Sequence, residues 1–547
     1  MIRRGAITML SGTLLALAWT SAFAAKPAQP MTCAELAQLA LPDTTITLAQ
    51  IVPAGVNPNP VGTIPIEICR VAGTVAPKIQ FEVWMPTQTW NGKFQGVGNG
   101  GLAGSIGYGA MRTALGTNYA TASTDTGHVS SDTLWFRDAQ QVIDNGYRGI
   151  HEMTVKAKAI VDAFYAKKPK YSYFNGCSTG GGQGFAEVQL YPKDYDGVLA
   201  GAPNYRPTRL RSGAHVWSWV AARPQPLGTP AVNVLAGQYT LMGNAVLDAC
   251  DTLDGVADRN IEDPRRCTFD PAAVLCQAGQ TTGCLTQPQV DAWRKLYAGA
   301  KDPVTGAEIF PGYARGAEFS WNGLFGGANP FGAANDFLRN TLFFGIPNYD
   351  FRSFDFHVDV MRFDQQYASI INAESVDLRA FEKRGGKMLV YHGWADHLIP
   401  TYNTLEYWAR LVDQYGGRHG EDAGFERVDE FARLFLIPGM GHCNGGANSP
   451  TDTFDGMGAL EQWVEKGIAP RRIVASHLTN GVVDKTRPLC LYPRVAVYRG
   501  EGDINDAASF ACRKPGRHHG HGHHGHDHDD HDHDGHGHDG HDGHDRD

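Results

Sequence analysis

The stretch Tyr171-Ser-Tyr-Phe-Asn-Gly-Cys-Ser-Thr-Gly-Gly-Gly-Gln-Gly-Phe-Ala-Glu187 decides the fold. A strand-like aromatic run leads into Gly176-Cys-Ser-Thr-Gly180, and a helical pattern follows. Gly-x-Ser-x-Gly between a strand and a helix is typical of a nucleophile elbow, in which glycines flank a serine whose hydroxyl is exposed on a tight turn. A glycine-rich turn with an incidental serine is the alternative. The strand–turn–helix context favours Ser178 as a nucleophile.

Strand-like and helix-like segments alternate on both sides of this elbow. Short strands separated by prolines are expected in 26–90, a buried strand at 119–124, a helix at 149–165 and another core strand at 195–203. This alternation predicts an α/β protein with a mostly parallel sheet covered by helices.

The alternation stops between residues 205 and 380, where glycines, prolines and scattered aromatic residues dominate. We interpret this segment as a lid inserted after a core strand, with some aromatics lining a cleft and most packed in a core. The aromatics are Trp217, Trp219, Trp321, Phe325, Phe331 and Phe343. The predicted division is a signal peptide (1–24), a first core part (25–204), the lid (205–380), a second core part (381–514) and a tail (515–547).

Two later strand ends carry the partners that a nucleophilic serine needs. An apolar run in 387–393 ends in a loop with Asp396, and another run ends in the loop Pro438-Gly-Met-Gly-His-Cys443. The order Ser178, Asp396, His442 is that of α/β-hydrolases, in which the histidine takes the serine proton and the acid orients the imidazole. Rivals on nearby loops are His128, His392, His397 and Asp484; none combines strand-end position and chain order as well.

A glycine-rich loop follows an early strand at 91–104. In hydrolases of this plan such a loop supplies one N–H group to the oxyanion hole, and the residue after the nucleophile supplies another. The candidates are Gly100 or Gly101, together with Thr179. A merely flexible loop is the alternative; a phosphate loop is excluded because no Gly-Lys-Ser/Thr ending follows.

The chain ends have distinct compositions. Arg3 and Arg4 precede an apolar run and the small residues of Ser21-Ala-Phe-Ala24, which predicts a secretory signal peptide cleaved after Ala24 or Ala25. The segment His518–His544 holds 13 of the 22 histidines and no apolar residue, so it is expected to be disordered and suited to Zn²⁺, Ni²⁺ or Cu²⁺. Metal capture and mere solubilisation both account for it.

Charge and cysteine content limit the function classes. The net charge of −9 lies mostly in the tail, where two Arg and nine Asp give −7, so the nearly neutral body does not suggest a nucleic-acid partner. No later segment is apolar enough to cross a bilayer. Ten cysteines without a Cys-x-x-Cys motif fit an oxidising compartment, periplasmic or extracellular, and their spacing alone does not fix their pairing.

An acidic loop lies inside the predicted lid. Asp251, Asp254 and Asp258 place three carboxylates around a glycine turn, and hard oxygen ligands in a flexible loop suit Ca²⁺. The spacing is not that of an EF-hand. Solvated surface acids are the alternative.

These motifs together resemble the tannase/feruloyl esterase family, which also includes the enzyme that hydrolyses mono(2-hydroxyethyl) terephthalate. The similar stretches occur in the same order over most of the chain: 98–101, 124–128, 176–181, 201–203, 251–258, 393–396 and 439–443. The resemblance implies an α/β-hydrolase fold with a large lid and a secreted serine esterase that cleaves phenolic acid esters such as feruloyl or galloyl esters.

The resemblance also implies disulfides and ligands. The expected pairs are Cys177–Cys443, Cys33–Cys69, Cys250–Cys267, Cys276–Cys284 and Cys490–Cys512. A structural calcium ion is expected on Asp251, Asp254 and Asp258 with the carbonyls of Val256 and Asn260.

Three alternatives to a phenolic-acid esterase remain open. One is a terephthalate-monoester hydrolase; that enzyme carries an acidic residue after its nucleophile, whereas Thr179 stands here, which favours the tannase or feruloyl esterase branch. Another is acyl transfer or lactone opening through the same acyl-enzyme. The last is a periplasmic metal-binding protein that acts through its tail.

Overall fold

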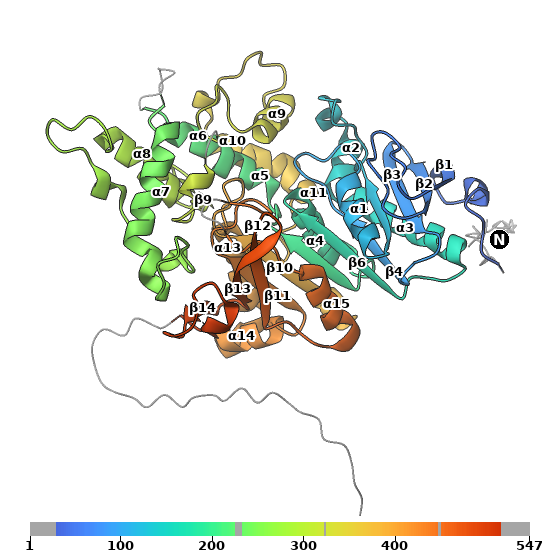
Figure 1. Cartoon of the computed structure of the whole chain (residues 1–547). Coiled ribbons are helices and arrows are strands. Elements are labelled where there is room, and N and C mark those ends of the chain that lie inside the picture. Colours follow the sequence, from blue (N-terminus) through green and yellow to red (C-terminus); the bar gives the residue numbers. More distant parts are fainter. Residues whose placement is uncertain (1–28, 225–231, 322–323, 447–449, 516–547) are drawn as a thin grey trace, which may run out of the picture.

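The core is a nine-stranded mixed sheet (Figure 1). The structure is a computed structural model, and it describes residues 29–224, 232–321, 324–446 and 450–515. In spatial order the strands are β1 (Thr44–Val52), β2 (Ile68–Val75), β3 (Ile79–Pro86), β5 (Ala120–Thr124), β4 (Lys93–Val97), β6 (Tyr171–Cys177), β7 (Gly197–Gly201), β10 (Lys387–Gly393) and β11 (Ala432–Ile437). Pairing is antiparallel from β1 to β5 and parallel from β5 to β11.

Helices cover both faces of the parallel part because neighbouring residues of each strand point to opposite sides. Phe174 and Val198 pack in one hydrophobic cluster, whereas their neighbours Tyr173 and Leu199 pack in another. The first cluster is closed by α3 (Gly149–Tyr165), α4 (Thr179–Leu190) and α13 (Tyr402–Gly416), and the second by α1 (Tyr108–Gly116) and α15 (Gly456–Lys466). This architecture is the predicted α/β-hydrolase fold, and α3 has the predicted limits.

The described residues between β7 and β10 (202–224, 232–321 and 324–386) add no strand to the main sheet. Besides short 3₁₀-helices, their described elements are α5 (Pro207–Arg209), a π-helix (Leu210–Val216), α6 (Trp217–Ala221), α7 (Ala236–Cys250), α8 (Gln287–Ala298), β8 (Ala300–Lys301), β9 (Glu308–Phe310), α9 (Gly332–Asn340), α10 (Val358–Phe363), a second π-helix (Asp364–Ala368), α11 (Ser369–Ile371) and α12 (Arg379–Lys383). Two hydrophobic clusters hold this lid together. The limits 205 and 380 given for it above remain predictions.

All five expected disulfides are present: Cys33–Cys69, Cys177–Cys443, Cys250–Cys267, Cys276–Cys284 and Cys490–Cys512. Two hairpins lie outside the main sheet: β12 (Arg472–Thr479) pairs with β13 (Val482–Cys490), and β14 (Val495–Tyr498) pairs with β15 (Phe510–Arg513). The Cys490–Cys512 disulfide joins β13 of the first hairpin to β15 of the second. Five disulfides fit an oxidising compartment.

In the described ranges no helix has the length and apolar character needed to cross a membrane. The predicted signal peptide (1–24) and residues 516–547 of the tail lie outside the described residues.

The backbone of α4 packs so closely against neighbouring backbone that an added side chain at its glycines should destabilise the fold. A Cβ at Gly181 would lie 2.2 Å from the Gly201 carbonyl oxygen and 2.9 Å from Pro203 Cα, whereas a Cβ at Gly109 in α1 would meet only the end of Arg112 at 3.9 Å. Gly181→Ala should therefore lower the free energy of unfolding by about 1–3 kcal/mol. Gly109→Ala, the control, should raise it by about 0.5–1 kcal/mol through helix propensity. Urea unfolding of both variants measures this, and equal changes would contradict the packing argument.

Candidate active site

Ser178 lies on the tight turn between β6 and α4, with φ of 65° and ψ of −121°. This left-handed backbone is strained for a non-glycine residue and is held by its neighbours. A Cβ at Gly176 would approach the Gly180 carbonyl oxygen to 2.6 Å, and one at Gly180 would approach the Asn99 oxygen to 3.0 Å. The glycines of the motif are thus required by close backbone contacts around the turn.

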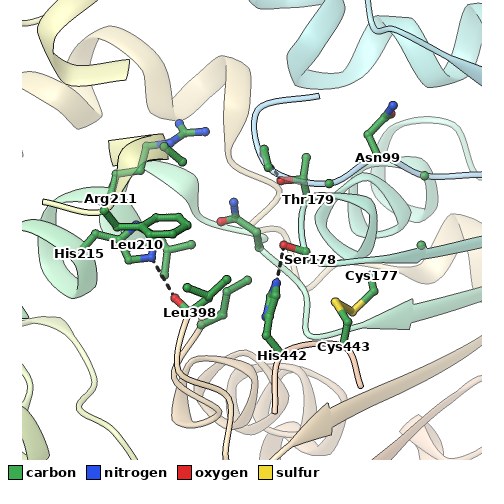
Figure 2. Close-up of a pocket in the computed structure, with 18 of the residues that line it drawn as sticks. Asn99, Cys177, Ser178, Thr179, Leu210, Arg211, His215, Leu398, His442 and Cys443 are labelled. Atoms are coloured by element: carbon green, nitrogen blue, oxygen red, sulfur yellow. Dashed lines mark hydrogen bonds between the residues drawn. A yellow bond between two sulfur atoms is a disulfide. The ribbon is translucent and has the colours of Figure 1, made fainter. Parts of the chain in front are cut away.

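The three residues predicted to act together meet in one hydrogen-bonded chain. The Ser178 hydroxyl donates to His442 Nε2 at 2.8 Å (Figure 2). His442 Nδ1–H donates in turn to Asp396 Oδ2 at 2.8 Å. Asp396 follows β10 and His442 follows β11, so both come from loops at the carboxyl ends of parallel strands beside β6 and β7.

Asp396 is fully buried and receives four donors. Besides His442, His392 Nε2–H donates to its Oδ2 at 3.0 Å, and the amides of Leu398 and Ile399 donate to its Oδ1 at 2.9 Å. Burial alone would raise the pKa of Asp396, but attraction to His442 and the hydrogen bonds from His392 and His442 hold that pKa well below its usual value. Asp396 is therefore ionised.

His392, one of the rival histidines, contacts the acid rather than the serine. Its Nε2–H is shared between Asp396 and the Ile399 carbonyl oxygen at 3.0 Å each, and its Nδ1 accepts from the Thr404 hydroxyl at 2.8 Å. This side chain therefore holds the same carboxylate oxygen, Oδ2, that accepts from His442. The four-residue spacing between His392 and Asp396 is the feature of the sequence that could have indicated this contact.

The other rivals lie away from the Ser178 hydroxyl. His128 is buried against Trp135, His397 has its ring centroid 6.5 Å from that of His442, and Asp484 pairs with His477 on the β12–β13 hairpin.

The glycine-rich loop after β4 packs directly on the elbow. Gly180 N–H donates to the Asn99 carbonyl at 2.7 Å, and the Thr179 hydroxyl donates to the Gly101 carbonyl at 2.5 Å. Within the described part of the chain, the amide N–H groups of Gly100, Gly101 and Thr179 have no hydrogen-bond acceptor. These are the three residues proposed above for an oxyanion hole, and they lie beside Ser178 in one pocket.

That pocket has a volume of about 500 Å³ and lies between the core and the lid. The core side is formed by the glycine-rich loop, the elbow and His442, and the lid side by Leu210, Arg211, His215, Phe331 and Ala333. Of the six lid aromatics named above, Phe331 lines this pocket. The other five pack in the two lid clusters.

Comparison with known proteins identifies the chain at family level. The family model described as tannase and feruloyl esterase matches residues 62–513. The chain belongs to the tannase and feruloyl esterase family. Membership makes it a carboxylic ester hydrolase.

Individual relatives cover nearly the whole length of this esterase. It is 36% identical to an uncharacterized esterase of Xanthomonas campestris, over 94% of this chain and 96% of that one. It is 35% identical to the mono(2-hydroxyethyl) terephthalate hydrolase of Piscinibacter sakaiensis, over 82% and 85%. The crystal structure of feruloyl esterase B from Aspergillus oryzae superposes with a TM-score of 0.80 at 31% identity, over 88% and 99%.

The acidic lid loop of this esterase has the donor types expected of a calcium site. The pKa of Asp254 is raised to about 6, mainly by burial and also by the Asp258 charge, and one buried oxygen each of Asp251 and Asn260 lacks a donor among the described residues. Asp258, however, already pairs with Lys485 at 2.9 Å and with Arg487. Within the described ranges no three His, Cys, Asp or Glu side chains are grouped to hold a metal ion. The donor types suit Ca²⁺, but their described positions do not gather three carboxylates, so the calcium site and its ligand set remain a prediction.

Asp125, whose side chain is buried, is hydrogen-bonded to the end of the glycine-rich loop. The Asp125 carbonyl accepts from Gly104 N–H at 3.1 Å, and its Oδ1 accepts from the amides of Gln80 and Gly127. Burial raises the pKa of Asp125 to about 7. The folded protein therefore binds this proton more tightly than the unfolded chain does, and this group's contribution to stability falls as pH rises from about 4 to 7.

Asp125→Asn should remove that pH dependence, because the amide retains Oδ1 and carries no charge. We expect the fall in Tm between pH 5 and pH 8 to be smaller in Asp125→Asn than in the parent protein. Glu501→Gln, at an exposed position, is the control and should leave the profile unchanged. An unaltered profile in Asp125→Asn would show that Asp125 titrates alike in the folded and unfolded states.

Proposed function

We propose that this ester hydrolase uses Ser178 as its nucleophile and cleaves esters of phenolic acids, such as feruloyl or galloyl esters, outside the cytoplasm. The observation that carries the proposal is the hydrogen-bonded chain from Ser178 through His442 to buried Asp396, beside a pocket whose lid side includes Phe331, Leu210 and Ala333.

The acylation step follows from this geometry. His442 Nε2 accepts the Ser178 proton as Oγ attacks the ester carbonyl carbon, and the ionised Asp396 stabilises the imidazolium that forms. The amides of Thr179 and of Gly100 or Gly101 would donate to the carbonyl oxygen as it becomes an oxyanion. Each such donor contributes about 10²–10³-fold in kcat in serine hydrolases.

The imidazolium then gives its proton to the leaving alcohol, and the acyl group stays on Ser178. Water, deprotonated by the same imidazole, attacks the acyl-enzyme and releases the acid. The reaction needs no metal at the ester, so any ion in the lid loop would be structural.

Two features bear on whether the substrate is a phenolic acid ester or a terephthalate monoester: the residue after Ser178 and the names of the relatives. The Thr179 hydroxyl donates a hydrogen bond to the Gly101 carbonyl, and this bond connects the glycine-rich loop to the elbow. The names of the relatives include both feruloyl esterase and mono(2-hydroxyethyl) terephthalate hydrolase. Phenolic acid esters are the first choice, and terephthalate monoesters are the alternative.

The compartment and the ions are part of the same proposal. The disulfides and the expected signal peptide support secretion to the periplasm or the medium. Ca²⁺ would bind Asp251, Asp254 and Asp258, and Zn²⁺, Ni²⁺ or Cu²⁺ would bind the histidine-rich tail.

Replacing the nucleophile tests the proposed function. Ser178→Ala should lower kcat at least about 10⁴-fold on methyl ferulate, methyl gallate, chlorogenate and mono(2-hydroxyethyl) terephthalate, with the fold intact by circular dichroism. Ser131→Ala, at an exposed loop serine, is the matched control and should match the parent enzyme. Full activity in Ser178→Ala would refute the mechanism, and a preference for the terephthalate ester would select the alternative substrate.

Calcium removal tests the lid site separately. Excess EDTA should lower Tm, and Ca²⁺ at about 100 times its Kd should restore about 2.7 kcal/mol of stability. Asp254→Ala should abolish this response, whereas Asp413→Ala, an exposed aspartate on α13, should retain it. A Tm that EDTA leaves unchanged in the parent enzyme, with no calcium found by elemental analysis, would refute the site.

A further inference from the structure

A second cavity, of about 760 Å³, lies next to the cavity of Ser178. Asn175 and Cys443 line both cavities, so the two share a wall at the end of β6 and at the Cys177–Cys443 disulfide. Its volume falls within the roughly 300–1,000 Å³ that is usual for small-molecule sites. The acylation and hydrolysis steps proposed above use none of the side chains that line it.

The floor of this second cavity is the face of the sheet that α1 and α15 cover. In the strand pairing Gln95 of β4 lies beside Tyr173 of β6, so Asn175, two residues further along β6, points to the same face as Gln95. Tyr391 of β10 packs in the hydrophobic cluster of this face, and its ring covers the paired Gly201 of β7, where an added Cβ would collide with it. The polar ends of Gln95, Asn175 and Tyr391 therefore stand over three neighbouring strands, β4, β6 and β7.

These three side chains have polar groups that no described residue satisfies. Gln95 is only 4% exposed, but its amide atoms keep some accessible surface, and this surface faces the cavity that Gln95 lines. The Asn175 amide and the Tyr391 hydroxyl are accessible as well. Burial raises the pKa of Tyr391 to about 12, so the hydroxyl keeps its proton at neutral pH. Polar groups that are largely withdrawn from water are costly without partners, so this floor suits a polar ligand.

The charged groups on the walls of the cavity, in contrast, are already engaged by the protein. Lys93 pairs with Glu461 at 2.9 Å and with Glu465 at 2.5 Å. Asp452 and Asp455 both accept backbone N–H groups. Three carboxylates and one ammonium group line the cavity, so its walls repel an anionic ligand such as a carboxylate. The groups left for a ligand are neutral.

We propose that this cavity binds a neutral polyhydroxylated ligand, a sugar or polyol unit. A ligand hydroxyl both donates and accepts, as do the side-chain amides of Gln95 and Asn175 and the hydroxyl of Tyr391. The rings of Tyr391 and Phe454 meet edge to face with centroids 5.2 Å apart, and they offer apolar surface to the C–H groups of a sugar ring. The proposal goes beyond the proposed esterase function, because it assigns a ligand to a separate cavity.

Calorimetric titration of the full-length protein tests the ligand class. The probes are two neutral trisaccharides, xylotriose and maltotriose, with trigalacturonate as the anionic probe and spermidine as the cationic one. At least one neutral trisaccharide should bind saturably, and neither charged probe should. Gln95→Leu and Tyr391→Phe should each raise the Kd for that trisaccharide by about 3- to 10-fold, because each removes hydrogen bonds to the ligand.

Two matched variants control for the loss of buried polar groups. The Tyr165 hydroxyl donates to the Pro86 carbonyl at 2.6 Å, the Gln141 amide donates to Asp138 at 2.9 Å, and neither side chain lines the cavity. Tyr165→Phe and Gln141→Leu should leave the Kd unchanged, whatever they do to Tm. If Gln95→Leu does not fold, Tyr391→Phe still tests the site.

Three results would overturn the site. These are no binding of either neutral trisaccharide, tighter binding of a charged probe, and a Kd that neither Gln95→Leu nor Tyr391→Phe changes. The last result would place the saccharide elsewhere on the protein.

Kinetics show whether the sugar unit belongs to the ester or to a separate glycan. If it belongs to the ester, kcat/KM for a feruloyl ester of xylotriose should exceed that for methyl ferulate by about 10-fold, and Gln95→Leu should lower this ratio. If a separate glycan binds, xylotriose binds but Gln95→Leu leaves the ratio unchanged. Both results support the site.

Binding needs no turnover, so the site and the proposed function can fail separately. Saccharide binding by a protein that hydrolyses no ester would refute the function and leave the site. Ester hydrolysis by a protein that binds neither neutral trisaccharide would refute the site and leave the function.

Discussion

The disulfide between Cys177 and Cys443 is the constraint on which the active site depends. It joins the residue before Ser178 to the residue after His442, 266 positions apart in the sequence. Cys177 is the last residue of β6, whereas Cys443 lies in the loop after β11, and loops are the mobile parts of most folds. With this bond in place, Ser178 Oγ and His442 Nε2, the proposed nucleophile and base, lie 2.8 Å apart. The glycine-rich loop is hydrogen-bonded to the same elbow through Gly180 and Thr179.

The hydrogen-bonded chain that starts at this elbow is satisfied by the protein itself, whereas two buried side chains of the lid are not. Asp396 has four donors, which offset the loss of hydration on burial and keep it ionised. Arg211 and His215 are equally buried, yet both have hydrogen-bonding atoms that no described residue satisfies. Ser178, His442 and Asp396 are therefore held in their hydrogen-bonded arrangement by the protein alone.

The sequence predicted that Ser178, Asp396 and His442 meet, and the structure joins them by hydrogen bonds, because the signals for these three residues are local. Ser178, Asp396 and His442 each follow a strand, and the carboxyl ends of parallel strands share one edge of the sheet. Contacts between segments that are distant in the sequence could not be predicted from it. Nothing near Asp258 shows that Lys485 and Arg487 pair with it, and no periodicity shows that residues 210–216 form a π-helix rather than a regular α-helix.

That π-helix also contacts the loop that holds the acid. Arg211 and His215 lie four residues apart in it, and both line the pocket of Ser178. His215 Nε2–H donates to the Leu398 carbonyl oxygen, and the Leu398 amide donates to Asp396 Oδ1. The described part of the lid adds no strand to the main sheet, so contacts of this kind, rather than the sheet, connect the lid to the hydrogen-bonded chain of Ser178, His442 and Asp396.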